Sequence, residues 1–331
     1  MKDAPAAKTG KSRFRKKQFL ADLAAGAIVD DVYYLRDVRL GRARTGKSFL
    51  ALRVSDRTGV MEARVWEAAE AMSQRLEPDS FIRARGRIEE YRQRPQLVIT
   101  GADPVGSSGL DQRDFLPGSY RDREELAGYL RYFLTEVFDP DFSRLLESFF
   151  GDEPFLERFS RAPGDARAHH AYLGGLIEHT VSVATLCQHT TVQHPRLNGD
   201  LLITAALLHD VGKVDEFLCD GRIRYSREGR LLGHVLIGQR LVEDRIRSFG
   251  DFPREKELDL IHAMISHHGE LEWGAPKRPQ SAEALVLHHI DNLDAKVKGF
   301  LEVVEGRGDV SWPELQNLFR RPLDEPQAAD R

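Results

Sequence analysis

Histidine and aspartate residues are grouped in the second half of the chain in a way that could bind metal. All 12 histidines lie at or beyond position 169. The informative ones occur in five short, helix-like segments: GGLIEHT with His179, LLHDVGK with His209 and Asp210, GHVLIG with His234, the pair His267–His268, and HHIDNLDAK with Asp291. Neutral imidazoles and carboxylates bind divalent transition-metal ions well. The pattern therefore predicts a metal centre.

The dipeptide His209–Asp210 is the most unusual of these features. It follows the apolar run ITAALL, and an apolar helix does not bury a carboxylate without a partner. A metal ion is the simplest partner for it. A single histidine near an apolar run is more often a core or surface residue, and four histidines are expected to be of that kind: His189, His194, His262 and His288.

The ordered set of segments resembles the HD-domain metal phosphohydrolases, in particular the branch that holds two metals. At the family level the chain resembles the YhaM-type 3′→5′ exoribonucleases through a barrel in front and four motifs: HHAYLGGLIEHT (169–180), LLHDVGK (207–213), LLGHVLIG (231–238) and SHHGELEWGAPKRPQSAEALVLHHIDNLDAK (266–296). The resemblance covers about residues 26–305. It implies metal-dependent hydrolysis of phosphodiester bonds in single-stranded RNA, or DNA, from the 3′ end, with release of nucleoside monophosphates.

The resemblance also implies roles for individual residues. It implies six metal ligands, with Asp210 bridging two divalent ions: His179, His209, Asp210, His234, His267 and Asp291. The choice between His267 and His268 as the ligand stays open, and the other of the two is expected to face the scissile phosphate. Mn²⁺ is the first expectation for the metal, and such ligands also accept Mg²⁺, Co²⁺, Fe²⁺, Ni²⁺ or Zn²⁺.

Four further residues are predicted near this centre. Lys213, about one helical turn after Asp210, is expected either to contact a substrate phosphate as a point charge or to cap a helix C-terminus. His170 lies in a segment that matches the family motif, and we expect it to contact the nucleic acid. Asp294 and Lys296 are expected to support the ligands from behind. Three residues are predicted to be catalytic: Asp210, Lys213 and His268.

The sequence pattern of residues 26–105 predicts a small five-stranded β-barrel. Alternating apolar and polar residues predict strands in five segments: VYYLRDVRL, FLALRVSD, VMEARVW, SFIRARGRIEEY and PQLVITGADPV. A short helix, EAAEAMSQRLEP, lies between the third and the fourth. Three strands, a helix and two strands are the plan of an OB-fold, which binds single-stranded nucleic acid with basic and aromatic side chains.

The outer face of the barrel and its first loop carry the residues expected to bind nucleic acid. In VMEARVW, alternation puts Met61, Ala63 and Val65 on one face. Arg64 and Trp66 then share the other face. An alternative role for Trp66 is to cap the barrel core. The predicted nucleic-acid contacts of the barrel are Arg42, Arg44, Lys47, Arg53, Arg64 and Trp66.

The chain is predicted to be multidomain, with the β-barrel followed by an all-α domain. The expected parts are a basic flexible tail (1–25), the OB-fold (26–105), a linker with connecting helices (106–160), the HD domain (161–310) and a C-terminal tail (311–331). Residues 1–110 hold 21 Lys and Arg against 14 Asp and Glu, a net charge of +7, whereas the remainder carries −11. A basic front part suits a polyanionic partner, although surface composition alone could produce it.

Several classes of protein are not indicated. No stretch approaches the ~20 apolar residues of a membrane helix, and the N-terminus lacks the apolar core of a signal peptide. Cys187 and Cys219 have no metal-ligand spacing and do not indicate a disulfide framework, so a reducing cytoplasm is the expected location. A homo-oligomer is left open, with residues 120–160 either mediating assembly or packing on the HD core.

Two other functions compete with an exonuclease. The first is a phosphohydrolase of small nucleotides or cyclic dinucleotides with a regulatory OB-fold. The segment EWGAP after His267–His268 argues against its commonest form, because the cyclic-di-GMP branch has GYP there. The second is a non-catalytic RNA-binding protein with a structural metal, against which the complete ligand set argues.

Overall fold

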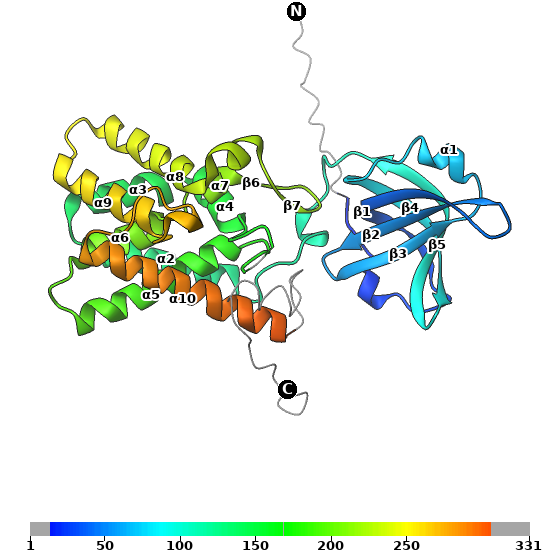
Figure 1. Ribbon diagram of the computed structural model, residues 1–331, viewed down its shortest axis with the longest axis horizontal. Coiled ribbons are helices and arrows are strands. Elements are labelled where there is room, and N and C mark those ends of the chain that lie inside the picture. The colour runs from blue at the N-terminus through cyan, green and yellow to red at the C-terminus, as the bar shows by residue number, and fades with distance from the viewer. Residues whose placement is uncertain (1–13, 168, 306–331) are drawn as a thin grey trace, which may run out of the picture. The chain divides into compact units, whose positions relative to one another are not determined.

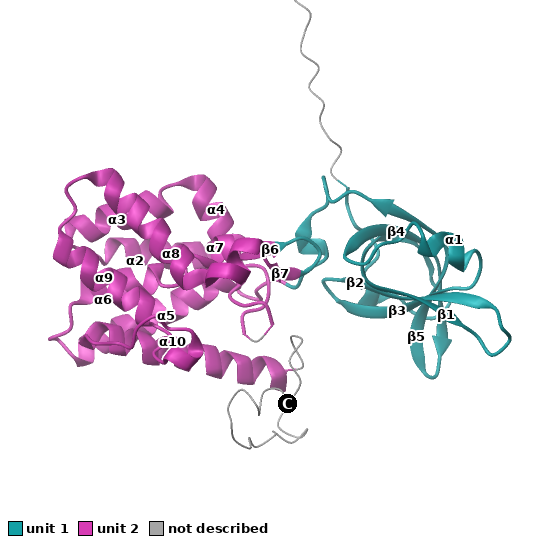
Figure 2. Cartoon of the chain, turned by 45° about the horizontal axis from the view of Figure 1, so that its top comes forward, with its two compact units in different colours: residues 1–117, 219–222 teal, residues 118–218, 223–331 magenta. Residues whose placement is uncertain are grey.

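The computed structural model describes residues 14–167 and 169–305 (Figure 1). The chain divides into two compact units (Figure 2). The barrel unit ends at Pro117 and also includes residues 219–222, and the helical unit holds the rest. The prediction of an OB-fold followed by an all-α domain is confirmed by the order of the elements.

Five strands close into the barrel in the order β1-β2-β3-β5-β4. All neighbouring pairs are antiparallel except β3 and β5, which are parallel. The elements in chain order are β1 (Ile28–Arg42), β2 (Ser48–Asp56), β3 (Gly59–Val65), α1 (Ala69–Ser73), β4 (Ser80–Tyr91) and β5 (Arg94–Val105). Each predicted strand and the predicted helix is present, in the order of an OB-fold.

Strands β2 and β3 bury alternate side chains, as the sequence predicts. Their pairing sets Leu52 opposite Ala63, and both are at most 1% exposed. The next pair, Arg53 and Glu62, faces outward and is exposed. Because a shift of one residue would exchange the two faces, burial of the apolar face fixes the register and keeps the charged residues outside.

The predicted flexible tail is ordered where the structure describes it. Leu20 lies in the barrel core, and its N–H donates to Asp56 Oδ2 at 2.8 Å. Lys16 is only 4% exposed, and its Nζ donates to Val32 O at 2.7 Å and lies 3.7 Å from Asp56 Oδ2. The prediction of a flexible tail up to residue 25 is therefore wrong for residues 14–25. The basic composition of this segment gives no sign that Lys16 and Leu20 contact the barrel.

The helical unit is built around one hydrophobic core. Its helices in chain order are α2 (Arg123–Thr135), α3 (Pro140–Phe150), α4 (Glu153–Arg161), α5 (Gly175–Gln193), α6 (Gly199–Leu208), α7 (Lys213–Glu216), α8 (Arg227–Phe249), α9 (Arg254–Ser266) and α10 (Ala282–Val304). A short hairpin of β6 (Phe217–Cys219) and β7 (Ile223–Tyr225) lies between α7 and α8. This hairpin was not predicted from the sequence.

Helices α2, α3 and α4 belong to the same core as the helices that follow them. Phe133, Phe149 and Phe159, one from each of these helices, are at most 1% exposed and lie in one cluster with Leu176 of α5. Residues 106–160 were predicted to be a linker with connecting helices. The helices of this segment are therefore part of the helical unit and do not form a separate connection. These helices pack on the HD core, which is one of the two arrangements expected for them.

Three simpler expectations concern the termini, the cysteines and membranes. Residues 1–13 and the predicted C-terminal tail, 311–331, lie outside the described residues. Cys187 and Cys219 are both free thiols. Over the part of the chain that the structure describes, none of the helices combines the length and the apolar character needed to cross a membrane.

We expect Lys16→Ala to lower the free energy of unfolding by about 3 kcal/mol, because removal of one partner leaves the buried Asp56 carboxylate without its cation. Lys17→Ala is the matched control, since Lys17 is exposed. Urea titrations of the full chain followed by circular dichroism measure both. Equal effects of the two substitutions would contradict a structural role for Lys16.

Candidate metal centre

The structure brings the predicted metal ligands together inside the helical unit. Each comes from a helix or from the residues just after one: His179 from α5, His209 and Asp210 from the end of α6, His234 from α8, His267 from the end of α9 and Asp291 from α10. His268 follows into the same centre. Residues more than a hundred positions apart in the sequence therefore converge on one place.

Three side chains form a first group of ligand atoms, namely His179, His209 and Asp291. One atom of each lies within 4.8 Å of the others. His179 Nε2 is 3.2 Å from His209 Nε2 and 3.1 Å from Asp291 Oδ1. Both rings are 1% exposed, so these atoms meet in the interior. Two imidazole nitrogens and a carboxylate oxygen in this arrangement could hold a divalent transition-metal ion.

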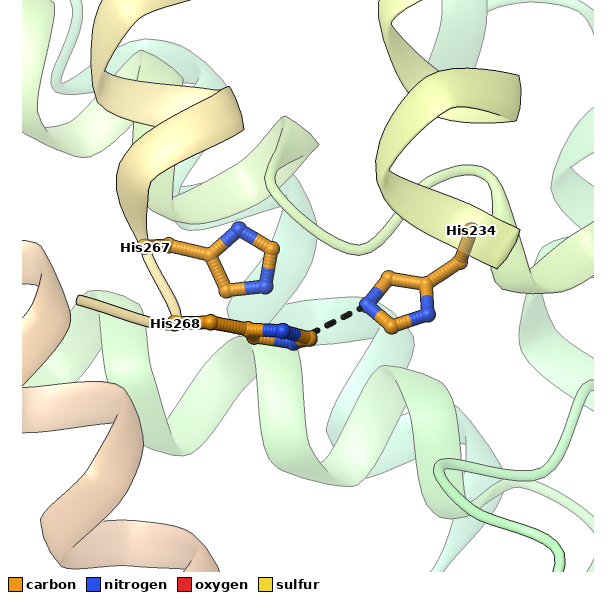
Figure 3. Close-up of side chains that lie close together, drawn as sticks. All are labelled: His234, His267 and His268. Atoms are coloured by element: carbon orange, nitrogen blue, oxygen red, sulfur yellow. Dashed lines mark hydrogen bonds between the residues drawn. The ribbon is translucent and has the colours of Figure 1, made fainter. Parts of the chain in front are cut away.

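The second group contains His234, His267 and His268, whose rings converge in Figure 3. His234 Nε2 is 3.2 Å from His268 Nε2, and one nitrogen of each of the three rings lies within 4.8 Å of the others. His267 is buried and His268 is partly exposed. The structure thus places both members of the His267–His268 pair at the centre and does not by itself select one as the ligand.

Asp210 lies between the two groups, with one oxygen toward each. Its Oδ2 is 3.4 Å from His179 Nε2 and 3.3 Å from His209 Nε2. Its Oδ1 is 3.4 Å from His234 Nε2 and 3.7 Å from His267 Nε2. This arrangement fits a carboxylate that bridges two metal ions.

The Asp210 carboxylate has few partners to offset its burial. The residue is 2% exposed, and neither oxygen has a hydrogen bond of good geometry from any described residue. Lys213 Nζ lies 2.6 Å from Oδ2 and supplies one positive charge. Burial of an ionised carboxylate is unfavourable unless it is paired or coordinates a metal. With imidazole nitrogens around them, these oxygens fit a divalent cation.

The other ring nitrogen of every histidine in the two groups is held by an acceptor. Nδ1 donates from His179 to Asp294 Oδ2 (2.7 Å), from His209 to Ala206 O (2.8 Å), from His234 to Glu216 Oε1 (3.1 Å), from His267 to Met264 O (2.6 Å) and from His268 to Trp273 O (2.9 Å). Carbonyl and carboxylate oxygens only accept, so Nδ1 carries a proton, and in the neutral ring Nε2 then presents its lone pair. A metal ligand needs this tautomer, and such outer hydrogen bonds also orient the ring.

The charges of the centre follow from burial and from neighbouring groups. Burial holds the pKa of His267 well below its ordinary value, so this ring is neutral. Burial also opposes a charge on His179, but hydrogen bonds with Asp291 and Asp294 outweigh it and raise its pKa to about 10. Burial would raise the pKa of Asp210, but nearby lysine and histidine charges hold it well below its ordinary value. The centre therefore attracts positive charge, either as a proton or as a metal ion.

Glu216 is a site residue that the sequence analysis did not identify. It is 4% exposed, and its Oε1 accepts from the backbone N–H of His234 at 2.9 Å as well as from the ring. Gly233, with φ of +72°, interrupts the helical path of α8 and aims that N–H at Glu216. A signal for Glu216 was present, because it is an acidic residue six positions after Asp210 in a segment that is mostly buried.

Close packing behind Asp210 depends on a glycine. A Cβ atom added to Gly212 would lie 2.1 Å from the backbone oxygen of His234. Any larger residue would push the segment after Asp210 away from α8. Since Asp210 and His234 must approach within 3.4 Å for the centre to form, Gly212 sets the separation of the elements that carry them.

The Asp294 carboxylate, next to the first group, accepts hydrogen bonds from three donors. It accepts from His179 Nδ1, from His170 Nε2 at 3.0 Å and from Ser182 Oγ. His170 is 1% exposed, and its Nδ1 lies 3.0 Å from Tyr172 Oη. The structure thus contradicts the predicted contact between His170 and nucleic acid, because both ring nitrogens are already engaged in the interior. His170 instead holds Asp294, which itself occupies the supporting position expected for it.

A pocket of about 340 Å³ lies against the centre. Asp210, Asp291 and residues of the second group line it together with Lys213. Lys213 is the first residue of the four-residue helix α7, and its Nζ lies beside Asp210 at the pocket. A volume of this size is at the lower end for a small-molecule site.

The predicted nucleic-acid residues of the barrel unit differ in their surroundings. Arg53 and Arg64 are each paired with a carboxylate, that of Asp37 and that of Glu62. Trp66 is 40% exposed and packs on a neighbouring phenylalanine ring with centroids 5.2 Å apart. By contrast, three basic residues at the β1–β2 connection are exposed and form no ion pair with any described residue: Arg42, Arg44 and Lys47.

Comparison with known proteins agrees with this geometry. The chain matches a family described as the HD domain over residues 176–296, and one described as the OB-fold nucleic acid binding domain over residues 34–105. It is similar to proteins named 3′-5′ exoribonuclease YhaM. The identity is 32% with that of Bacillus subtilis over 82% of this chain and 86% of the relative, and 34% with that of a Geobacillus species over 81% and 82%. It is 30% with that of Listeria monocytogenes over 84% and 88%.

We expect Asp294→Ala to weaken metal binding by roughly 10- to 100-fold, because His179 loses the acceptor that orients its ring. Titration with Mn²⁺ in competition with a chelator measures the affinity. Asp215→Ala is the matched control, since Asp215 pairs with Arg158 and touches no ligand ring. Equal affinities of the two variants would show that Asp294 does not act on the centre.

Proposed function

The chain belongs to the family of YhaM 3′-5′ exoribonucleases, and we propose that it removes nucleotides from the 3′ end of single-stranded RNA and releases nucleoside monophosphates. The single observation that carries the proposal is the Asp210 carboxylate, which has one oxygen toward each of two groups of imidazole nitrogens. Metal-assisted attack on phosphorus uses a centre of this kind. The OB-fold supports the choice of a single strand as the substrate.

Within this proposal, each group holds one divalent ion and Asp210 contributes to both. The ligands of the first ion are His179, His209, Asp210 and Asp291, and those of the second are Asp210, His234 and His267. We propose Mn²⁺ as the ion, since mixed imidazole and carboxylate ligands accept it. When bound, two such ions lower the pKa of a water molecule and neutralise charge on the attacked phosphate.

Lys213 and His268 act on the substrate itself. Burial would lower the pKa of the Lys213 ammonium, but Asp210 outweighs burial and raises it, so the group stays charged. It therefore binds a phosphate oxygen as a point charge. His267 and His268 both line the pocket, and His268 is the more exposed of the two, which supports His267 as the ligand. Burial lowers the pKa of His268, so its unprotonated Nε2 can accept a proton beside the reacting phosphate.

We expect Asp210→Asn to reduce RNA degradation roughly 100-fold or more, since loss of an outer hydrogen bond alone reduces metal affinity or activity 10- to 100-fold. A gel time course with Mn²⁺ on single-stranded RNA, labelled at either end, measures the rate. With wild-type protein, a 3′ label should appear at once as a mononucleotide, whereas a 5′ label should shorten step by step. Asp215→Asn is the matched control.

Three results would contradict the proposed function. One is degradation by Asp210→Asn at the wild-type rate. Another is release of a mononucleotide from the 5′ label first. The third is rapid hydrolysis of free nucleotides or cyclic dinucleotides with intact RNA left over, which would favour a small-molecule phosphohydrolase with a regulatory barrel.

We also propose that the unpaired basic residues of the β1–β2 connection contact phosphates. Replacing all three by glutamine should weaken RNA binding and reduce the slope of log Kd against log salt by about 2, since each lost phosphate contact contributes about 0.7. Filter binding across a salt series measures the slope.

The matched control for this triple removes three positive charges that are already paired with carboxylates: Arg75, Arg83 and Arg87. It changes the net charge of the barrel unit by the same amount. If both triple variants reduced the slope equally, the effect would come from net charge and not from contacts at the β1–β2 connection.

A further inference from the structure

A large aromatic side chain stands exposed on the wall of the reactive pocket. Trp273 is 45% exposed and lines the same pocket as Asp210, Lys213 and Asp291. It is the last residue of the short 3-10 helix η3 (Leu271–Trp273). Single exposed apolar residues are common on protein surfaces. Beside a centre of ionised and imidazole groups, however, an indole offers what those groups lack, namely a broad face for a planar apolar ligand.

The backbone of Trp273 is tied to the metal centre by a hydrogen bond. Its carbonyl oxygen accepts the Nδ1–H of His268 at 2.9 Å, so the residue is tied to a ring whose Nε2 points at the second group. Lys296 Nζ lies 5.5 Å from the indole centroid. Lys296, expected to be a supporting or structural residue, is exposed, and its Nζ lies over the Trp273 ring. A cation beside the indole suits a ligand that carries phosphate.

A second, independent observation also points to a polar ligand in this pocket. His169 lines it, and its Nδ1 is buried without a hydrogen-bond partner among the described residues. A buried polar atom without a partner is unfavourable, and a ligand can satisfy it. The same pocket is thus lined by the exposed indole of Trp273, by His169 with its unpaired nitrogen and by the ammonium group of Lys213.

We propose that the indole of Trp273 stacks on the base of the 3′-terminal nucleotide while its phosphodiester lies at Asp210 and Lys213. This inference rests on the proposed function and adds a base subsite to it. Stacking accepts every base because each has a π-face. The subsite would thus position the last nucleotide for hydrolysis without selecting a sequence, as removal of successive nucleotides requires.

The test compares RNA that ends in a normal nucleotide with RNA whose 3′-terminal nucleotide is abasic. For the wild-type protein, removal of that base should lower kcat/KM by roughly 10- to 100-fold. Trp273→Ala should lower kcat/KM on normal RNA by a similar factor and show no further loss on abasic RNA. Trp273→Phe should retain part of the preference. A base preference as large in Trp273→Ala as in the wild type would overturn the subsite.

Leu271→Ala is the matched control, because Leu271 lies on the same turn, is 54% exposed and does not line the pocket. It should behave as wild type on both substrates. If Trp273→Ala does not fold, a measurement on the wild-type protein alone still tests the subsite. Adenosine 5′-monophosphate should inhibit at least ten-fold more strongly than ribose 5-phosphate, and equal inhibition would overturn the subsite. If the wild type fails to shorten normal RNA from its 3′ end, the proposed function fails; if it shortens both RNAs equally, only the subsite fails.

Discussion

Burial of the Asp210 carboxylate is the constraint on which the helical unit depends. An ionised carboxylate that is 2% exposed destabilises a fold by several kcal/mol unless positive charge or a metal compensates it. Among the described residues, Lys213 is the lysine that pairs with it, and His267 is held neutral by its own burial. The surrounding elements therefore have to deliver ligand atoms and not charges. Five histidines have Nδ1 held by an acceptor and Nε2 turned toward the two groups, so each neutral ring can offer a ligand atom there.

The ends of two helices position and orient ligand rings. His209 and His267 directly follow α6 and α9, where the last backbone carbonyls have no partner within the helix. Each ring donates Nδ1–H to one of those carbonyls, three residues earlier. The same hydrogen bond thus satisfies the helix end and fixes the tautomer and orientation of a ligand. Where a ring lies within a helix, as for His179 and His234, a buried carboxylate replaces the carbonyl.

Patterns of residue type could be predicted from the sequence, whereas the orientation of individual side chains could not. The barrel strands were predictable because burial with period two is visible in the residue types themselves, as in Met61, Ala63 and Val65. The need of a buried carboxylate for a partner pointed to Asp210, whereas the full set of candidate ligands came from the resemblance to a known family. Which way a ring turns was not predictable. His170 and His169 are neighbours, yet His170 is engaged in the interior and His169 lines the pocket, and spacing alone does not distinguish them.

The two units also differ in what their positive charges are free to do. At the β1–β2 connection the cations are exposed and form no ion pair with any described residue, so their binding to a polyanion would release counterions condensed on that polyanion and would depend strongly on salt. In the helical unit Lys213 is 7% exposed and faces Asp210, and salt screens such a buried pair only weakly. Under the proposed function, capture of a strand and attack on its phosphate would therefore rest on electrostatics of different kinds. A change of salt that releases the strand leaves the charges around the reacting phosphate almost unaltered.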